Sequence, residues 1–326
     1  MANYHQKHHQ RPKTKPTHFQ GMVTVSKKMM EFIEQLKKAA ASDANILIRG
    51  DSGTGKELAA RAIHSLSPRS KGPFQALNCA TLTSELMQSE LFGHVKGAFT
   101  GAVADRKGLF EAAHRGTLFL DEIAEMPKDL QPRLLRVLQE RHFSPVGSFK
   151  IVQSNVRLVS ATHQSLRRLV EGGVFRADLM YRIRVIPLFL PRLVERERDI
   201  EILSWLFIDE FNRLGQRVIS AIAADAIEAM LKYPWPGNIR ELRNNIEHAY
   251  GMGEGDMLRL RDLAPEVQGA PIPQNQAIDG PSIRRQEVDE ILTALREANH
   301  RKGEAAAKLG ISRSKLWRKI REYGIQ

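Results

Sequence analysis

Apolar residues recur along the first part of the chain at alternating helical and strand spacings. From Lys27 onward, the apolar residues that fall on one helical face are Met29, Ile33, Leu36 and Ala40. Short apolar runs that predict buried strands follow at 45–48, 117–120 and 156–159. A helix between the last two runs carries Leu130, Leu134, Leu135 and Leu138 on one face, with Pro132 in its first turn. This alternation predicts an α/β domain with a parallel sheet and helices on both faces.

The pattern changes near residue 192, and beyond it only helices are predicted, including helices at 221–232 and 237–250. These helices would form a small lid on the α/β domain. Proline, glycine and glutamine then mark a linker. The predicted segments are a disordered basic tail at 1–18, the α/β domain at 19–192, the helical lid at 193–264, the linker at 265–282 and a small all-α domain at 283–326.

The charge of the chain is unevenly placed. The 326 residues carry a net charge of +12, yet residues 299–326 hold eight Lys and Arg against two acids. A basic end on a balanced body predicts a nucleic-acid-binding module. The single cysteine, Cys79, excludes a disulfide framework, and no apolar run is long enough to cross a membrane. We therefore expect a cytoplasmic protein without membrane insertion.

A predicted phosphate-binding loop follows the first apolar run. Its residues fit the pattern GxxxxGK and are Gly50, Asp51, Ser52, Gly53, Thr54, Gly55, Lys56 and Glu57. Glycines let backbone N–H groups surround the phosphates of ATP, and Lys56 is expected to reach the β- and γ-phosphates. Glu57 stands where a hydroxyl usually binds Mg²⁺, so the metal must depend on nucleotide oxygens, water and an acid elsewhere.

That acid is predicted to be Asp121, directly after the apolar run 117–120. Glu122 stands beside it, where it can orient and polarise the attacking water. A metal-bound aspartate followed by a glutamate is the arrangement that hydrolytic phosphoryl transfer needs. An isolated pair of acids is often a solvated helix start, but this pair follows a buried strand. ATP and Mg²⁺ are therefore the predicted cofactors.

One segment between the loop and the acidic pair has no periodicity. It consists of Gly97, Ala98, Phe99, Thr100, Gly101 and Ala102, so that small residues surround a single large aromatic. Such a loop can present Phe99 to a partner and withdraw it again. The hexapeptide GAFTGA resembles the sigma-54-contacting loop of the bacterial enhancer-binding AAA+ ATPases. Segments 77–93, 175–179 and 235–242 are similar to the same family, and the resemblance covers residues 19–326.

The resemblance implies a hexameric ring with ATP sites between subunits. Asn78 would hold Glu122 off the water until the ring is engaged. Arg176 and Arg182 would be arginine fingers for the neighbouring subunit's ATP, because guanidinium groups match phosphate oxygens. Arg240 would be the lid arginine that senses the γ-phosphate in its own subunit. Without the resemblance, Arg176 and Arg182 would be interpreted as members of surface ion pairs.

Two positions depart from the family pattern. His163 stands where the family usually has asparagine, and Val194 where it usually has arginine. A histidine still donates a hydrogen bond, but with a different reach. We expect ATP hydrolysis to survive and its coupling to be altered. Segment 141–154 resembles the second insertion of the family, which works beside the loop that carries Phe99.

The end of the chain is predicted to be a helix-turn-helix. A short helix at 304–309 is followed by a turn at 310–311, and Ser312 caps a second helix at 313–322. Its final part resembles the Fis-like DNA-binding domains of the family. The candidates for base or phosphate contacts in the major groove are Arg313, Ser314, Lys315, Arg318 and Lys319. The apolar stripe 288–295 would pair two subunits, which predicts an inverted-repeat site.

These observations favour a sigma-54-dependent transcription activator. It would bind upstream enhancer DNA, assemble from dimer to hexamer, and use ATP hydrolysis to remodel the closed complex of sigma-54 RNA polymerase. Only a short tail precedes the ATPase, so we expect no receiver domain and a separate regulatory protein. Two alternatives stay open: an AAA+ motor of another class, such as a DNA translocase or unfoldase, and a repressor in which ATP only governs oligomerisation. Both leave the Phe99 loop without a use.

Overall fold

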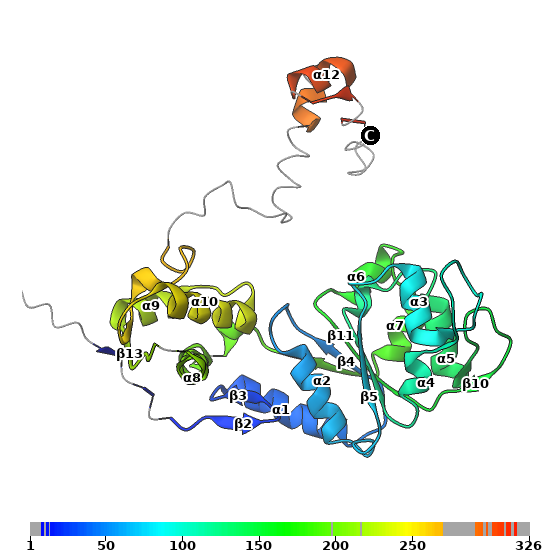
Figure 1. Cartoon of the computed structure of the whole chain (residues 1–326), viewed down its shortest axis with the longest axis horizontal. Helices are drawn as coiled ribbons and strands as arrows, with labels where there is room; N and C mark the ends of the chain where they lie inside the picture. The colour runs from blue at the N-terminus through cyan, green and yellow to red at the C-terminus, as the bar shows by residue number, and fades with distance from the viewer. Residues whose placement is uncertain are drawn as a thin grey trace, which may run out of the picture. The chain divides into compact units, whose positions relative to one another are not determined.

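A computed structural model describes most of the chain as two units, Met1–Gln268 and Gly269–Gln326, which we treat separately (Figure 1). The residues described are 8–9, 11–12, 14–196, 198–215, 217–269, 291–295, 298, 302–309, 311–313 and 316–317. Within them, no helix has both the length and the apolar character needed to span a membrane.

A five-stranded parallel sheet in the order β12-β4-β11-β8-β5 forms the centre of the larger unit. Its strands are β4 (Ile46–Arg49), β5 (Phe74–Asn78), β8 (Thr117–Asp121), β11 (Arg157–Thr162) and β12 (Ile186–Phe189). Side chains alternate between the two faces, so that Ile46 and Ile48 enter one core and Leu47 the other. The three apolar runs predicted to be strands are β4, β8 and β11, which confirms the parallel α/β fold.

Helices cover both faces of the sheet, as predicted (Figure 1). One face packs against α1 (Lys27–Ala40) and α2 (Lys56–Ser65). The other face packs against α3 (Ser84–Phe92), α4 (Leu109–Ala112), α5 (Gln131–Glu140), α6 (Leu166–Glu171), α7 (Ala177–Ile183) and the 3₁₀ turn η1 (Ile123–Glu125). The leucine-rich helix of the sequence is α5, and Pro132 lies in its first turn. Proline is tolerated there because the first-turn N–H groups have no helical partner.

Three short antiparallel hairpins project from this framework. The first pairs β2 (Thr17–Phe19) with β3 (Met22–Thr24), ahead of α1. The others belong to two insertions and pair β6 (Gly93–His94) with β7 (Arg106–Lys107), and β9 (His142–Phe143) with β10 (Val152–Gln153).

The lid contains α8 (Asp199–Leu214), α9 (Ala224–Lys232) and α10 (Asn238–Met252), with the 3₁₀ turns η2 (Leu193–Glu195) and η3 (Leu260–Asp262). The expectation of helices alone was wrong. Residues Ala221–Ala223 form β13, which pairs in parallel with β14 (Met257–Leu258). Ile222 is fully buried in this pair. Pairing with the distant strand β14 therefore makes the start of the predicted helix 221–232 part of a sheet.

The predicted disorder of residues 1–18 does not hold for the described part of that segment. His8–His9 form β1, which adds antiparallel to β13. Arg11 pairs with Asp209, and its guanidinium lies 4.8 Å from the ring centroid of Trp205. The lid thus provides three contacts for this segment: the Asp209 carboxylate, the face of the Trp205 ring and the edge of β13. The composition of residues 1–18 did not indicate these contacts.

The smaller unit has its own core around α12 (Lys302–Lys308). Its buried residues are Ile291, Ala294, Leu295, Ala298, Ala305, Ala306 and Leu316. Ile291 and Leu295 belong to the stripe expected to pair two subunits, but here they are buried against their own chain. Ala305 and Ala306 are too small to form a core by themselves, and Ile291 and Leu295 supply the larger side chains. Of the predicted DNA contacts, Arg313 is exposed, and Ser314, Lys315, Arg318 and Lys319 lie outside the described residues.

Candidate active site

The glycine-rich loop connects the end of β4 to the start of α2, as predicted. Gly53 has φ 75° and Gly55 has φ 102°, which are backbone angles that other residues rarely adopt. Lys56 is 7% exposed, and its Nζ donates to the carbonyls of Gly50 at 3.0 Å and Asp51 at 3.4 Å. The ammonium group therefore lies within the curve of the loop, where the backbone surrounds a bound phosphate.

The lid holds the outer side of this loop through the start of α10. The Asn238 side chain donates to the Ser52 carbonyl at 2.9 Å, and Ile239 N donates to the Gly53 carbonyl at 3.0 Å. Arg240 Nη1 lies 3.1 Å from Ser52 Oγ. The structure thus brings Arg240 to the loop from nearly two hundred residues away.

A buried arginine that the sequence did not single out supports the loop from behind. Arg196 is 2% exposed and donates to the carbonyls of Thr54 at 2.8 Å and Pro191 at 3.0 Å. Burial lowers the pKa of Arg196 to about 10, although nearby Asp199 opposes the change. A buried cation bonded to loop carbonyls holds the loop in one shape, because leaving those carbonyls unpaired would be costly.

Glu122 lies at the carboxyl end of β8 in a left-handed conformation, with φ 48°. Its Oε1 lies 3.1 Å from Lys56 Nζ, and its Oε2 lies 2.7 Å from His163 Nδ1. Burial is the largest influence on the pKa of Glu122 and raises it, but the hydrogen bond with His163 and the charge of Lys56 together lower the pKa below its ordinary value. The side chain is therefore held ionised and aimed at the loop.

Asp121 has a different environment from its neighbour. Burial, with a smaller effect from the Glu122 charge, raises the pKa of Asp121 above its ordinary value. Its Oδ1 accepts from Glu122 N at 3.0 Å, and none of the described residues forms an ion pair with it. A half-buried carboxylate without a cationic partner fits the hard oxygen ligation that Mg²⁺ prefers.

Asn78 lies beside this pair, since it is in register with Asp121 across β5 and β8. Its side chain has another partner, because Asn78 Oδ1 accepts from Ala80 N at 2.8 Å. In the described chain, the side-chain partners of Glu122 are Lys56 and His163. Sequence reasoning singled out His163 as a departure from the family pattern but did not find its contact with Glu122.

The two predicted finger arginines lie on and beside α7 and are bonded elsewhere. Arg176 forms a two-point ion pair with Asp178, with hydrogen bonds of 3.0 and 2.7 Å. Arg182 donates to the Leu138 carbonyl at 2.8 Å. Both side chains are exposed, so the structure does not bring them to Lys56 or Glu122 of their own chain.

The Phe99 loop lies at the tip of the hairpin β6–β7. Phe99 is 42% exposed, and its ring meets His94 edge-on at 4.9 Å. Gly97 and Gly101 have φ 80° and 100°, and a Cβ at either position would have no described atom within 4 Å. Val146 exchanges backbone hydrogen bonds with Val95 and Gly93, so the second insertion supports the base of this loop.

Comparison with known proteins identifies all three parts of the chain. Residues 22–189 match the Sigma-54 interaction domain, residues 194–278 the AAA+ ATPase lid domain, and residues 282–323 the family described as Bacterial regulatory protein, Fis family. The first match alone covers more than half of the chain.

Individual relatives agree. The chain is 45% identical to Regulatory protein AtoC of Escherichia coli (strain K12), over 93% of this chain and 68% of AtoC. It is 44% identical to Transcriptional regulatory protein ZraR of the same strain, over 92% of this chain and 68% of ZraR. The structure is similar to that of NtrX from Brucella abortus in complex with ATP, with TM-score 0.68 and 34% identity over 93% of this chain and 69% of NtrX. The chain therefore belongs to the sigma-54-dependent enhancer-binding transcription activators, whose central domain is an AAA+ ATPase.

Proposed function

We propose that this protein assembles into a ring on upstream enhancer DNA and uses ATP hydrolysis to remodel the closed complex of sigma-54 RNA polymerase into an open one. The observation that carries the proposal is the Phe99 loop. An aromatic side chain stands partly exposed between two unhindered glycines of positive φ. A translocase or a repressor has no use for such a loop, whereas an activator needs a contact that moves with the nucleotide state.

The hydrolytic roles follow from the contacts of each residue. The loop 50–57 and Lys56 bind the phosphates of ATP, and Arg240 approaches from the lid. Glu122 orients the attacking water and accepts its proton. Asp121 would hold Mg²⁺, which supplies charge neutralisation at the phosphate oxygens when bound. Asn78 is proposed to hold Glu122 off the water in another state of the ring, after leaving its bond with Ala80 N.

The finger arginines support a ring in which neighbouring subunits complete each other's sites. Arg176 and Arg182 are exposed and make no contact with the loop of their own chain among the described residues. A guanidinium supplied from outside is what the developing charge on the phosphates requires. Arg176 has to leave Asp178 to act in this way, so its engagement is reversible.

The remaining partners are proposed from the match of the C-terminal unit to the Fis family and from the resemblance to enhancer-binding activators. The Fis-type helix-turn-helix would place Arg313, Ser314, Lys315, Arg318 and Lys319 against an inverted-repeat enhancer site. Control is proposed to come from a separate regulatory protein, and the site of action is the cytoplasm.

The Phe99 loop gives the sharpest test of this function. Phe99→Ala and Thr100→Ala are expected to keep ATP hydrolysis and DNA binding but to lose open-complex formation at a sigma-54 promoter. The physical reason is that both side chains lie on the presented loop and neither contacts the nucleotide site. The measurement is ATP-dependent open-complex formation with purified protein, alongside the ATPase rate.

Val103→Ala is the matched control, because Val103 is 81% exposed directly after the hexapeptide and lies outside it. Its activation should equal that of the unmodified protein. Full activation by both Phe99→Ala and Thr100→Ala would refute the activator assignment and leave the fold untouched.

The contact between His163 and Glu122 gives a second expectation. His163→Ala should lower kcat for ATP hydrolysis by about tenfold, a part of the 10²–10⁴-fold that a positioned base contributes, with little change in KM. The control is His142→Ala, since His142 lies near Glu140 at 3.3 Å and has no role at the site. Steady-state kinetics of both variants measure this change in kcat. An unchanged kcat in His163→Ala would show that Glu122 does not depend on this bond.

A further inference from the structure

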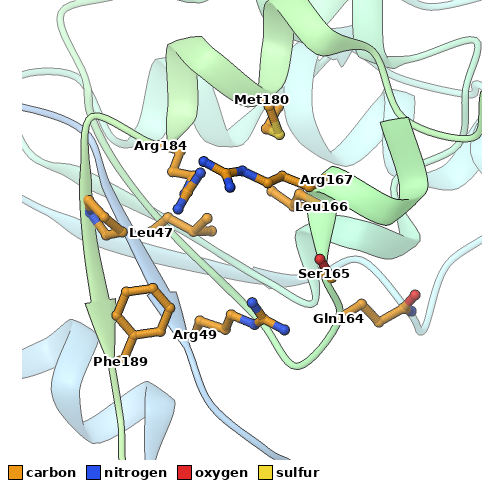
Figure 2. Close-up of a pocket in the computed structure, with 10 residues that line it drawn as sticks. Leu47, Arg49, Gln164, Ser165, Leu166, Arg167, Met180, Arg184 and Phe189 are labelled. Atoms are coloured by element: carbon orange, nitrogen blue, oxygen red, sulfur yellow. The ribbon is translucent and has the colours of Figure 1, made fainter. Parts of the chain in front are cut away.

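A cavity of about 100 Å³ opens where β4 and β12 end (Figure 2). Its floor consists of two pairs of residues from these strands, which lie opposite each other in the parallel register. Leu47 is paired with Pro187, and Arg49 with Phe189. Alternation along a strand places Leu47 and Arg49 on the same face, so the Arg49 side chain follows an apolar floor toward the open end.

Two other elements close the cavity. Met180 belongs to α7, and Arg184 follows directly after this helix. The opposite side is the segment after β11, where Ser165 precedes Arg167 on α6. Figure 2 shows Arg167 and Arg184 extending toward each other across the cavity, with Arg49 below them. Three guanidinium groups from separate elements therefore surround one small space.

No carboxylate among the described residues neutralises the charges of these arginines. None of the three forms an ion pair or a side-chain hydrogen bond in the described chain, and no Asp or Glu lines the cavity. Arginines elsewhere on the surface do find carboxylates, as Arg69 does with Asp43 and Arg136 with Glu140. Like charges held near one another raise the free energy of the folded protein, and a bound anion offsets this.

The nearby acids are engaged elsewhere, and a serine hydroxyl adds a donor. Glu125 is bonded to the Gln164 side chain at the rim, Asp178 is paired with Arg176, and Glu122 is held by Lys56 and His163. Ser165 makes no side-chain capping bond to the described backbone of α6, so its hydroxyl is a further donor.

We propose that this cavity binds a compact oxyanion of the phosphate class, at a site separate from the ATP site. Guanidinium groups bind phosphate oxygens through paired N–H donors. The space holds several waters or one tetrahedral anion. No residue of the loop 50–57 lines the cavity. Gln164, which lines one wall of the cavity, directly follows His163 in the sequence. An anion bound in the cavity therefore contacts the segment that positions Glu122.

Thermal unfolding of the full-length protein with a saturating non-hydrolysable ATP analogue tests the proposal, because the analogue fills the α-, β- and γ-phosphate positions of the ATP site. At constant ionic strength, inorganic phosphate should raise the unfolding temperature in a saturable manner, whereas chloride should not. Arg49→Gln and Arg167→Gln should each raise the apparent dissociation constant of phosphate by at least about tenfold. Arg168→Gln is the matched control, since Arg168 is exposed on the same helix and does not line the cavity.

A second measurement separates binding from a structural role of the arginines. Without phosphate, Arg49→Gln and Arg167→Gln should unfold at the temperature of the unmodified protein or above it, because each removes an uncompensated charge. Glycerol phosphate in place of inorganic phosphate distinguishes a small phosphate ester from free phosphate as the natural source, and a saturable response to either one supports the site. An equal phosphate response in the variants and the unmodified protein, or a response that chloride reproduces, would overturn it.

Discussion

Arg176→Ala should lower kcat for ATP hydrolysis by about a thousandfold or more, with a much smaller change in ATP affinity, and Arg182→Ala should behave alike. A finger arginine acts on the charge that develops during phosphoryl transfer, so its loss affects the reaction more than binding. Arg136→Ala is the matched control, because Arg136 is exposed and paired within its own helix with Glu140. Its kcat should be unchanged.

Mixing experiments show where the arginine acts. Glu122→Gln removes the base but leaves Arg176 in place, whereas Arg176→Ala keeps Glu122. A mixture of the two inactive proteins should recover part of the hydrolysis rate, since one kind of interface then contains both groups. If the mixtures stay inactive while both proteins assemble, the arginine does not act on a neighbouring subunit.

Gly53→Ala is expected to weaken ATP binding by at least about a hundredfold, which corresponds to about 3 kcal/mol. Gly53 has φ 75°, and a Cβ there would lie 2.1 Å from the Gly237 carbonyl oxygen. That contact cannot be relieved by a side-chain rotation, because the atom belongs to the backbone. The lid must move away, which breaks the bonds from Ile239 N to Gly53 and from Asn238 to Ser52.

Gly173→Ala separates this clash from simple backbone strain. Gly173 has φ 67°, and an added Cβ would have no described atom within 4 Å. The variant should lose about 1 kcal/mol of folding free energy from the left-handed conformation and keep normal ATP affinity. Nucleotide titration and thermal unfolding of both variants provide the comparison. ATP binding by Gly53→Ala as tight as that of the unmodified protein would show that the lid contact is unnecessary.

Much of the nucleotide site was predictable because its signals are local. The order of strand, glycine-rich loop and helix predicted a loop that begins at Gly50 after β4 and leads into α2 at Lys56, and the apolar run before Asp121 predicted β8. Glycine is favoured where φ is positive, and a buried strand needs apolar residues on both faces, so both features can be recognised within a short stretch of sequence. The five predicted segment boundaries and the roles of Asn78, Arg176 and Arg182 stay predictions.

Strands β5 and β12 were not predicted, because their burial is partial and their residues alternate weakly. β13 was mistaken for the start of a helix, since its partner β14 lies more than thirty residues further along the chain. In each case the pairing strand, and not the local sequence, decides the conformation.

What the sequence determined by itself is the chemistry of the chain: a phosphate loop, an acidic pair, a glycine-flanked aromatic and a basic helical end. Each depends on residue types within a few positions of one another. Only the tertiary structure decided that Arg196 supports Thr54, that Asn238 and Arg240 hold Ser52, and that His163 positions Glu122. The partners in these contacts are separated by 142, 186, 188 and 41 residues respectively. No local pattern encodes such a contact, because the two partners come together only when the sheet and the lid pack.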